Sequence, residues 1–297
     1  MRRVVVLAAL AVLVVAGCGG SSKPKSPAAL IFVSTRDTDY AIFGAEADGS
    51  HQYRLTSAKV DSSSPAKLFF QIEPHWSPGG KQIAFVSGRD GHGHVYVMNA
   101  DGTDTRRITN TAQDDSHPTW SADGRWLAFS REGALFRQPV SGGPARRLLK
   151  NALGNAADPA YSPDGKHVAY DYRRPGFSIR EVYVMNADGS GARKLTNLRW
   201  VSGYPAWSPD GKQIAFMSNA GGTHDHNEVY TIPLAGGQVK QQTFSTTDAI
   251  QPAWAPDGGL SYSLDGALWL VRDGKYSKLT SGKDNDSAPA WNPVPPK

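Results

Sequence analysis

Short apolar runs recur along the chain, and each is bounded by turn residues. Examples are IAFV at 83–86, LAF at 127–129 and IAFM at 214–217. A strand with one solvated face should alternate apolar and polar residues, and these runs do not alternate. Continuous apolar runs of this length indicate strands that are covered on both faces. The pattern therefore predicts β-sheets that are stacked against one another.

One phrase of about fourteen residues surrounds these runs. It reads PAWSPDGKQIAFMS at 205–218, and its variants begin at Pro74, Pro118, Pro159, Pro252 and Pro289. The aromatic residues at the same place in each copy are Trp76, Trp120, Tyr161, Trp207, Trp254 and Trp291. Their spacing, mostly 41 to 47 residues, matches the period of a four-stranded propeller blade.

Each unit divides into four short strands. The first carries Pro-x-Trp-Ser, and Pro-Asp-Gly, as at 163–165 and 209–211, predicts a tight turn into the second. The third reads VYVM at 95–98 and 182–185, and leads into Asn-Ala-Asp-Gly. We expect the fourth strand to end in Leu-Thr or Ile-Thr, as at 55–56 and 108–109.

The two ends of the repeat array are complementary. Second strands are expected near Ile31, Ile83, Leu127, Val168, Ile214 and Leu260. The first of them has no Pro-x-Trp strand before it, whereas the last Pro-x-Trp copy, PAWNPV, has no second strand after it. We predict that PAWNPV is the inner strand of the blade that begins at Leu30. The fold class is then an all-β, six-bladed propeller closed by its C-terminal strand.

The sequence WSPDGK, followed by IAF, VYVMNADG and LT, resembles the TolB-like β-propeller repeat of the WD40-like Pro-Asp family. The resemblance covers nearly all of residues 28–297. It implies the same six-bladed fold, but a fold by itself does not define a function.

The N-terminus has the pattern of a secretion signal. Arg2 and Arg3 precede an apolar run at 4–15 that is too short to span a membrane. The following Val-Ala-Gly-Cys resembles a bacterial lipobox, which implies cleavage before Cys18 and a lipid on its sulfur. We expect a signal peptide at 1–17, a lipidated cysteine and tether at 18–27, and the propeller at 28–297. The protein would be anchored to the outer side of a bacterial membrane, in the periplasm or at the cell surface.

Composition and motifs restrict the function. The net charge of +5 falls to +3 without Arg2 and Arg3, and no Lys/Arg run suggests a nucleic-acid partner. Cys18 is the only cysteine, so we expect no disulfide. Neither Gly-x-Ser-x-Gly nor His-Glu-x-x-His occurs, nor does a phosphate-binding glycine loop. We therefore expect a monomer that is not an enzyme and holds no cofactor.

Variable loops should gather on one face of the propeller. The segments 89–94, 172–181 and 219–228 differ between blades, as do 73–76, 113–118 and 246–251, which lead into the inner strands. Recognition is more often carried by such loops than by repeated turns. The candidate partner-binding residues are His75, Asp115, His117, Arg173, Arg174, His224, Asp225, His226 and Asp248.

These residues leave several functions open. We favour a non-catalytic scaffold that binds an envelope protein or peptide. His224, His226 and Glu228 would share one side of an extended segment and could hold a metal, although a solvated loop is the simpler interpretation. Resemblance to oligogalacturonate lyases, which use a histidine-bound metal, makes a metal-dependent polysaccharide lyase the alternative. A sensor of glycans or small ligands is a third possibility.

Overall fold

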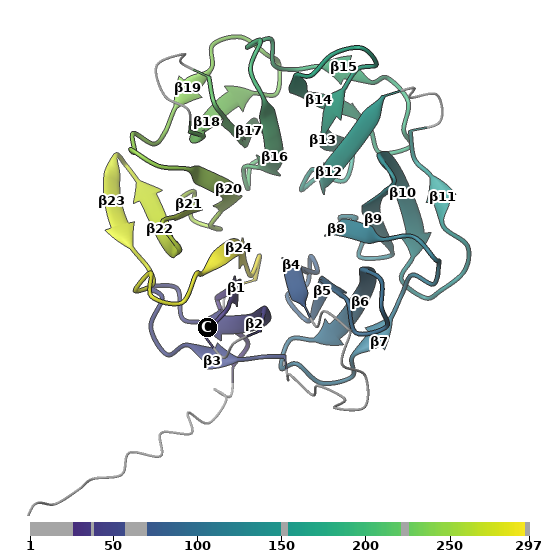
Figure 1. The fold of residues 1–297 in the computed structure, drawn as a ribbon, viewed down its shortest axis with the longest axis vertical. Helices are drawn as coiled ribbons and strands as arrows, with labels where there is room; N and C mark the ends of the chain where they lie inside the picture. The colour runs from purple at the N-terminus through teal and green to yellow at the C-terminus, as the bar shows by residue number, and fades with distance from the viewer. Residues whose placement is uncertain (1–25, 37–38, 57–69, 150–153, 221–225, 295–297) are drawn as a thin grey trace, which may run out of the picture.

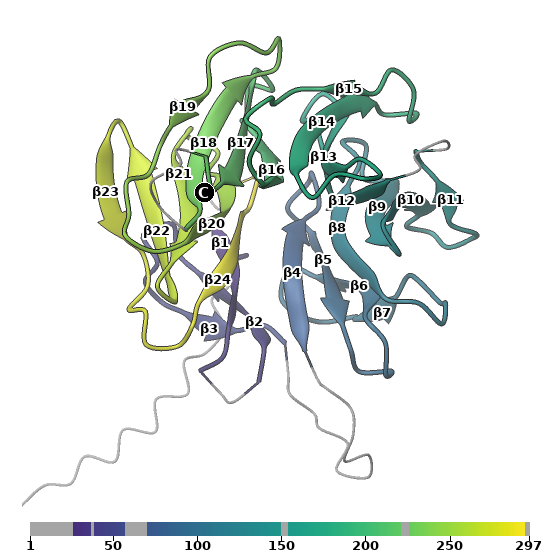
Figure 2. The same ribbon diagram turned by 45° about the horizontal axis from the view of Figure 1, so that its top comes forward.

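The computed structural model describes residues 26–36, 39–56, 70–149, 154–220 and 226–294. These residues form six four-stranded antiparallel sheets arranged around a central axis, which is a six-bladed β-propeller (Figures 1 and 2). The predicted fold class is confirmed. In the parts of the chain that the structure describes, no helix is long and apolar enough to cross a membrane.

Every blade runs from an inner strand at the axis to an outer strand at the rim. In that order, blade 1 contains β24 (Ser287–Trp291), β1 (Leu30–Ser34), β2 (Ala41–Ala45) and β3 (Tyr53–Arg54). Blade 2 contains β4 (Gln71–Trp76), β5 (Gln82–Ser87), β6 (His94–Asn99) and β7 (Arg106–Arg107). Blade 3 contains β8 (Asp115–Trp120), β9 (Trp126–Arg131), β10 (Ala134–Pro139) and β11 (Arg146–Arg147).

The other three blades follow the same plan. Blade 4 contains β12 (Asn155–Tyr161), β13 (His167–Arg173), β14 (Arg180–Asn186) and β15 (Arg193–Lys194). Blade 5 contains β16 (Ser202–Trp207), β17 (Gln213–Ser218), β18 (Glu228–Pro233) and β19 (Lys240–Gln241). Blade 6 contains β20 (Ala249–Trp254), β21 (Leu260–Leu264), β22 (Ala267–Arg272) and β23 (Lys275–Lys278).

Blade 1 is closed as the sequence predicts. β24 pairs antiparallel with β1, and Leu30 lies opposite Trp291 in the register. Just beyond this pair, the Asn292 side-chain amide donates to the carbonyl of Ala28 at 3.2 Å. In blade 5 the equivalent residue, Ser208, instead accepts the backbone N–H of Gln213 across a covalent turn. Blade 1 has no covalent turn between its inner and second strands, and the Asn292 side chain connects the two chain segments by a hydrogen bond at that place.

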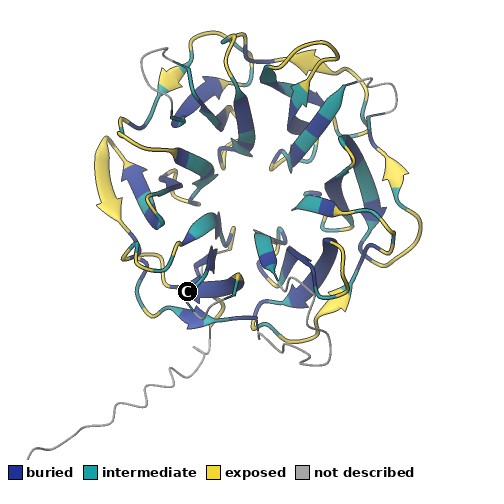
Figure 3. Cartoon of the chain, in the orientation of Figure 1, coloured by how far each residue is buried: buried dark blue, intermediate teal, exposed yellow. Residues whose placement is uncertain are grey.

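The core lies between neighbouring blades. The second strands are almost entirely buried, and exposure increases toward the outer strands (Figure 3). Trp207 of blade 5, for example, packs in one cluster with Val182 and Val184 of blade 4. A fully buried side chain such as Phe216 contributes roughly 1.5–3 kcal/mol relative to an exposed one. This stacking explains why the apolar runs do not alternate.

The fourth strands end earlier than expected. β7 stops at Arg107, and Ile108 and Thr109 follow it outside the strand. The Thr109 hydroxyl accepts the backbone N–H of Val95 at 3.0 Å, and the N–H of Ile108 donates to the Val95 carbonyl at 2.8 Å. The Leu-Thr and Ile-Thr pairs therefore follow the fourth strand, and the threonine side chain bonds to the third strand. The prediction that these pairs end the fourth strand is wrong.

The propeller has two distinct faces. The turn face carries the turns after the inner strands, such as 208–211, and those between third and fourth strands, such as 186–189. The loop face carries the loops between second and third strands and those that lead into each inner strand. Since Leu30 lies opposite Trp291, at the turn end of β24, the chain enters blade 1 from the turn face.

Candidate functional site

Each inner strand is interrupted by a bulge just before its proline. The antiparallel register shifts there in all six blades. The residues at the bulge have φ values between 49° and 55°, and they are Glu73, His117, Asp158, Tyr204, Gln251 and Ala288. Such left-handed backbone is uncommon for residues other than glycine. The bulge is thus a repeated feature of the backbone, whereas the side chain that it carries differs in every blade.

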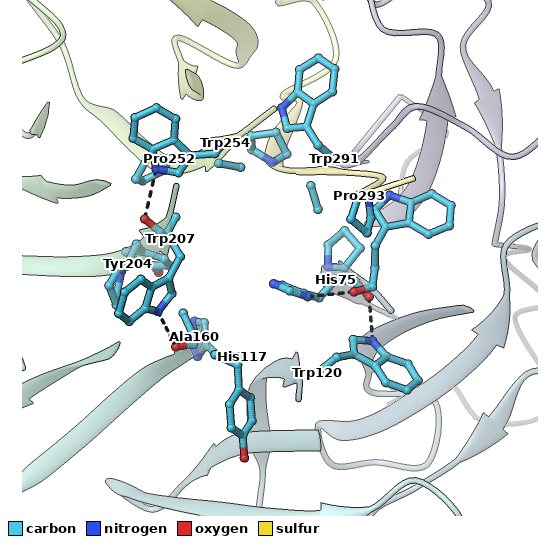
Figure 4. A pocket seen from close by; sticks show the side chains of 18 of the residues that line it. His75, His117, Trp120, Ala160, Tyr204, Trp207, Pro252, Trp254, Trp291 and Pro293 are labelled. Carbon is cyan, nitrogen blue, oxygen red and sulfur yellow. Dashed lines mark hydrogen bonds between the residues drawn. The ribbon is translucent and has the colours of Figure 1, made fainter. Parts of the chain in front are cut away.

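These six residues, the central ring, lie at one end of a cavity of about 550 Å³ on the propeller axis. Figure 4 shows His117 and Tyr204 of the ring beside the wall residues. The walls are formed by the prolines and aromatic anchors of the inner strands. The lining at the other end consists of Pro78, Ala122, Pro163, Pro209, Pro256 and Pro293. These belong to the turns after the inner strands, so the cavity extends from the central ring to the turn face.

The tryptophans of the wall connect neighbouring blades. The indole N–H of Trp207 donates to the Ala160 carbonyl at 2.9 Å, and that of Trp254 to the Ala206 carbonyl at 3.2 Å (Figure 4). Trp291 donates to the Ser261 hydroxyl at 2.8 Å. Because these indoles pack and bond between blades, they act as structural residues rather than as an open stacking platform for sugars.

Charged side chains occupy one half of the central ring. The His117 Nε2 atom lies 3.1 Å from Glu73 Oε1 and 3.0 Å from Asp158 Oδ1. The backbone N–H of His117 also donates to Glu73. The ring of Tyr204 meets the His117 imidazole edge-on, with centroids 5.7 Å apart. Behind Asp158, the buried Asp171 is bound by the Arg180 guanidinium.

The buried acids of this half hold their protons more strongly than in water. Burial raises the pKa of Glu73, and the charge of His117 opposes this only in part. Burial, followed by the charge of Asp158, raises the pKa of Asp171 well above its ordinary value despite Arg180. Burial and the same carboxylates raise the pKa of Tyr204. The ring environment therefore disfavours negative charge.

The other half of the ring carries no charge. The Gln251 side-chain oxygen accepts the backbone N–H of Ala288 at 3.0 Å. Ala288 is the smallest residue of the ring and follows Gln251 around the axis, next to Glu73. The cavity thus has apolar walls, a charged half and an uncharged half at its inner end.

The structure places the predicted residues in different environments. His117 belongs to the central ring, and His75 lines the cavity wall with its Nδ1 3.3 Å from the Trp76 carbonyl oxygen. Asp115 is buried, with 1% exposure, and binds Arg131 through both carboxylate oxygens at 2.6 and 3.1 Å. It does not lie at the surface.

Other predicted residues lie on the loop face. Arg173 and Arg174 are exposed, and the Arg174 guanidinium stacks on Phe177 at 5.0 Å. Asp248 accepts the backbone N–H of Asn227 at 2.7 Å. Cys18, His224 and Asp225 lie outside the described residues.

The suggested metal ligands are already engaged where the structure describes them. His226 Nε2 lies 3.4 Å from Glu228 Oε1. Glu228 is buried, and it accepts hydrogen bonds from the Thr243 hydroxyl and the Ser245 N–H. Among the described residues, no three His, Cys, Asp or Glu side chains are grouped so that they could hold a metal ion.

Of the six members of the central ring, sequence reasoning named only His117 as a candidate, and it missed Glu73, Asp158, Tyr204, Gln251 and Ala288. In the sequence these residues can be recognised by their position, directly before the proline of each Pro-x-Trp phrase. The residue at this position changes from blade to blade while the residues after it repeat. The cavity also extends to the face whose turns seemed purely structural.

Most of the exposed aromatic residues lie in segments of the loop face. Of the six large apolar side chains that are exposed in the described chain, four lie in loop-face segments: Tyr40, Phe177, Trp200 and Phe244. Phe244 is 76% exposed, the highest value among them. Such aromatics at the surface are typical of interaction sites.

Comparisons with known proteins agree with this architecture. The family model described as the TolB β-propeller domain, PD40, matches residues 65–155 and 138–294. Tricorn protease homolog 1 from Streptomyces coelicolor is 27% identical over 190 residues, covering 57% of this chain and 17% of that protein. The Tol-Pal system protein TolB from Desulfosudis oleivorans is 29% identical over 124 residues, covering 39% of this chain and 26% of that protein.

The solved structures include the same fold. TolB from Acinetobacter baumannii superposes with a TM-score of 0.74 at 22% identity, covering 89% of this chain and 66% of that one. The curated relatives above are matched over about a quarter of their own length or less. With most of its residues matched by the family model, the chain belongs to the TolB β-propeller (PD40) family.

Proposed function

We propose that the protein is a non-catalytic binding scaffold of the bacterial cell envelope, anchored by a lipid on Cys18, and that its loop face binds a protein or peptide partner. The observation that carries this proposal is that four of the exposed large apolar side chains lie in segments of that face: Tyr40, Phe177, Trp200 and Phe244. Aromatic side chains supply most of the binding energy in many protein interfaces.

The surroundings of these aromatics support a polypeptide partner. Arg173, Arg174 and Arg199 are exposed in the same loop-face segments as Phe177 and Trp200. Arginine is enriched with aromatics at interfaces because its guanidinium both stacks and forms paired hydrogen bonds. A partner that offers apolar and acidic side chains would complement this surface.

The anchor would leave the loop face accessible. The described chain enters blade 1 from the turn face, and nine residues, 19–27, lie between Cys18 and Ala28, which makes ten steps along the chain. Ten residues span at most about 35 Å when fully extended. The lipid would therefore hold the turn face toward the membrane, and the loop face would point away from it.

Some of the relatives are named as TolB proteins of the Tol-Pal system, and this supports an envelope role for the present chain. A metal-dependent lyase has less support, because the described ligand candidates are not assembled into a metal site. The candidate histidines also lie in different places: His117 belongs to the central ring, and His226, in the loop between β17 and β18, contacts Glu228.

The partner can be identified by crosslinking in the bacterium that produces the protein. A photo-crosslinker at Arg174 should give one dominant adduct with an envelope protein. The same probe at Asp188, on the turn face, is the matched control and should not give it. Changing Phe177 and Trp200 to serine should remove the adduct. Equal adducts from both faces, or none from Arg174, would contradict a loop-face scaffold.

The anchor needs a separate test. Cells given a radiolabelled fatty acid should incorporate it into the wild-type protein but not into Cys18→Ser, which should leave the membrane fraction. Equal membrane association of the two forms would show that Cys18 is not the anchor, without affecting the test of the loop face.

A further inference from the structure

The charged half of the central ring has too few hydrogen-bond donors. His117 Nε2 can carry one hydrogen, yet Glu73 and Asp158 each place a carboxylate oxygen about 3 Å from it. An ionised carboxylate only accepts hydrogen bonds and can accept several. The backbone N–H of His117 donates to Glu73, while Asp158 shares the Nε2 hydrogen and contacts the Asp171 carboxyl. Both carboxylates can accept further donors.

The same half has too little positive charge. In the described chain no lysine or arginine binds Glu73 or Asp158, and the one basic side chain that these two carboxylates share is His117. Arg180 is used by Asp171 and by the side-chain oxygen of Asn155, at 2.6 Å. Buried carboxylates without enough partners are costly, which agrees with the raised pKa of Glu73. A group that brings both N–H donors and positive charge would complement this site.

The shape of the cavity restricts what such a group can be attached to. The walls between the ring and the turn face are formed by prolines and tryptophans, and the volume of about 550 Å³ is typical of ligand sites. Ala288, beside Glu73, leaves one ring position without a long side chain. An aliphatic chain can pass along apolar walls while its charged end stays at the polar end, as lysine and arginine side chains do in proteins.

We propose that the central cavity binds an ammonium or guanidinium group on an aliphatic stem, as in a lysine or arginine side chain, with the cation between Glu73 and Asp158 and the stem extending toward the turn face. This site is separate from the loop face and does not depend on its partner.

Tryptophan indole signals provide a direct test. Five of the eight tryptophans line the cavity, at positions 76, 120, 207, 254 and 291, whereas Trp200 is exposed on the loop face. In NMR spectra of the folded protein with labelled indole nitrogens, Nα-acetyl-lysine methylamide, which keeps its charged ε-ammonium group, should shift the signals of the cavity tryptophans saturably. The Trp200 signal should not shift. N-acetyl-norleucine methylamide, which has the same stem without the charge, should bind at least tenfold more weakly. Equal binding of both probes, or shifts at Trp200 alone, would overturn the proposal.

Substitution of the two carboxylates tests whether they bind the cation. Glu73→Gln combined with Asp158→Asn keeps the shapes and removes the charges, and should weaken lysine-probe binding at least tenfold. Asp273→Asn removes one exposed carboxylate elsewhere and should leave binding unchanged. If the double variant does not fold, which its indole spectrum will show, the lysine and norleucine comparison in the wild type decides. Unchanged binding in a folded double variant would overturn the proposal.

A third probe distinguishes the source of the cation. Butylamine carries the ammonium without a peptide backbone. Binding equal to that of the lysine probe would indicate a free amine as the ligand, and clearly weaker binding would indicate a basic side chain of a peptide. Either result supports recognition of the cation.

Discussion

The indole N–H of Trp120 donates to the backbone carbonyl of His75 at 3.1 Å, across the boundary between blades 3 and 2. The tryptophans at 207 and 254 repeat this bond at two other boundaries. The indole nitrogen of Trp76 is equally buried but has no hydrogen-bond partner among the described residues. The same residue at the same place in the repeat therefore forms an interblade hydrogen bond at some boundaries, whereas between blades 1 and 2 Trp76 contributes packing alone among the described residues.

This difference predicts unequal effects of one substitution. Trp120→Phe removes the indole bond to the His75 carbonyl, whereas Trp76→Phe removes a donor that has no partner in the described chain. Both lose similar apolar surface. We expect Trp120→Phe to lower the free energy of unfolding by about 1 kcal/mol more than Trp76→Phe, in urea titrations. Equal losses would mean that the interblade bond contributes nothing measurable.

The buried pair of Asp115 and Arg131 should be sensitive to the loss of one partner. The Arg131 guanidinium binds the carboxylate and stacks over Phe129 and Phe136. Arg131→Met leaves the Asp115 carboxylate buried without its guanidinium, with the His94 imidazole 4.0 Å away as its neighbour, so we expect a loss of about 3–5 kcal/mol in unfolding free energy.

A surface pair provides the control for that experiment. Arg272 and Asp257 form an ion pair whose side chains are about half exposed. Arg272→Met should reduce the unfolding free energy by less than about 1 kcal/mol. If both substitutions had the same small effect, Asp115 would have to be satisfied by other groups in the folded protein.

The acids behind the central ring should make stability depend on pH. The unfolded chain releases the Asp171 proton near pH 3.8, but burial keeps that proton bound to higher pH in the folded protein. The folded state then binds more protons, so stability falls as pH rises above 3.8 until the folded pKa is passed. Asp171→Asn should flatten this fall, measured as urea midpoints between about pH 4 and 7. Glu73 contributes a slope of the same sign and should remain.

An exposed acid should show the opposite sign. Hydrogen bonds from Ser190 lower the pKa of Asp188, so its contribution is present above pH 3.8 and is lost as pH falls through the lowered value. Asp188→Asn should therefore not flatten the fall of stability at higher pH. An identical response of the two variants would contradict the assignment to Asp171.

Asn292 should control the closure of blade 1. Asn292→Ala removes the bond to the Ala28 carbonyl, and we expect a loss of about 1–2 kcal/mol because the carbonyl becomes a buried, unpaired acceptor. Native-state hydrogen exchange should then be faster in β1 and β24. Ser208→Ala, at the equivalent place in blade 5, should speed exchange within blade 5 instead. Faster exchange at the same sites in both variants would indicate global rather than local opening.

Much of the fold could be predicted because the same repeat phrase occurs six times in the sequence. The Pro-x-Trp phrase predicts the inner strands, and the unmatched copy at Pro289 predicts the inner strand of the blade that begins at Leu30, which the structure confirms. The central ring could not be predicted in the same way, because its side chains face one another only after the bulges turn them toward the axis. Asp115 shows the converse: a polar residue in a variable segment became a buried partner of Arg131.

The bond between Asn292 and Ala28 joins residues 264 positions apart. During synthesis, β1 (30–34) is made long before β24 (287–291), and its inner edge stays unpaired until β24 has been produced. Contacts of such separation form slowly. Loss of β24 through a premature stop or proteolysis would therefore leave five intact blades beside an unpaired β1 edge. A truncated chain would differ from the closed propeller by this exposed strand edge.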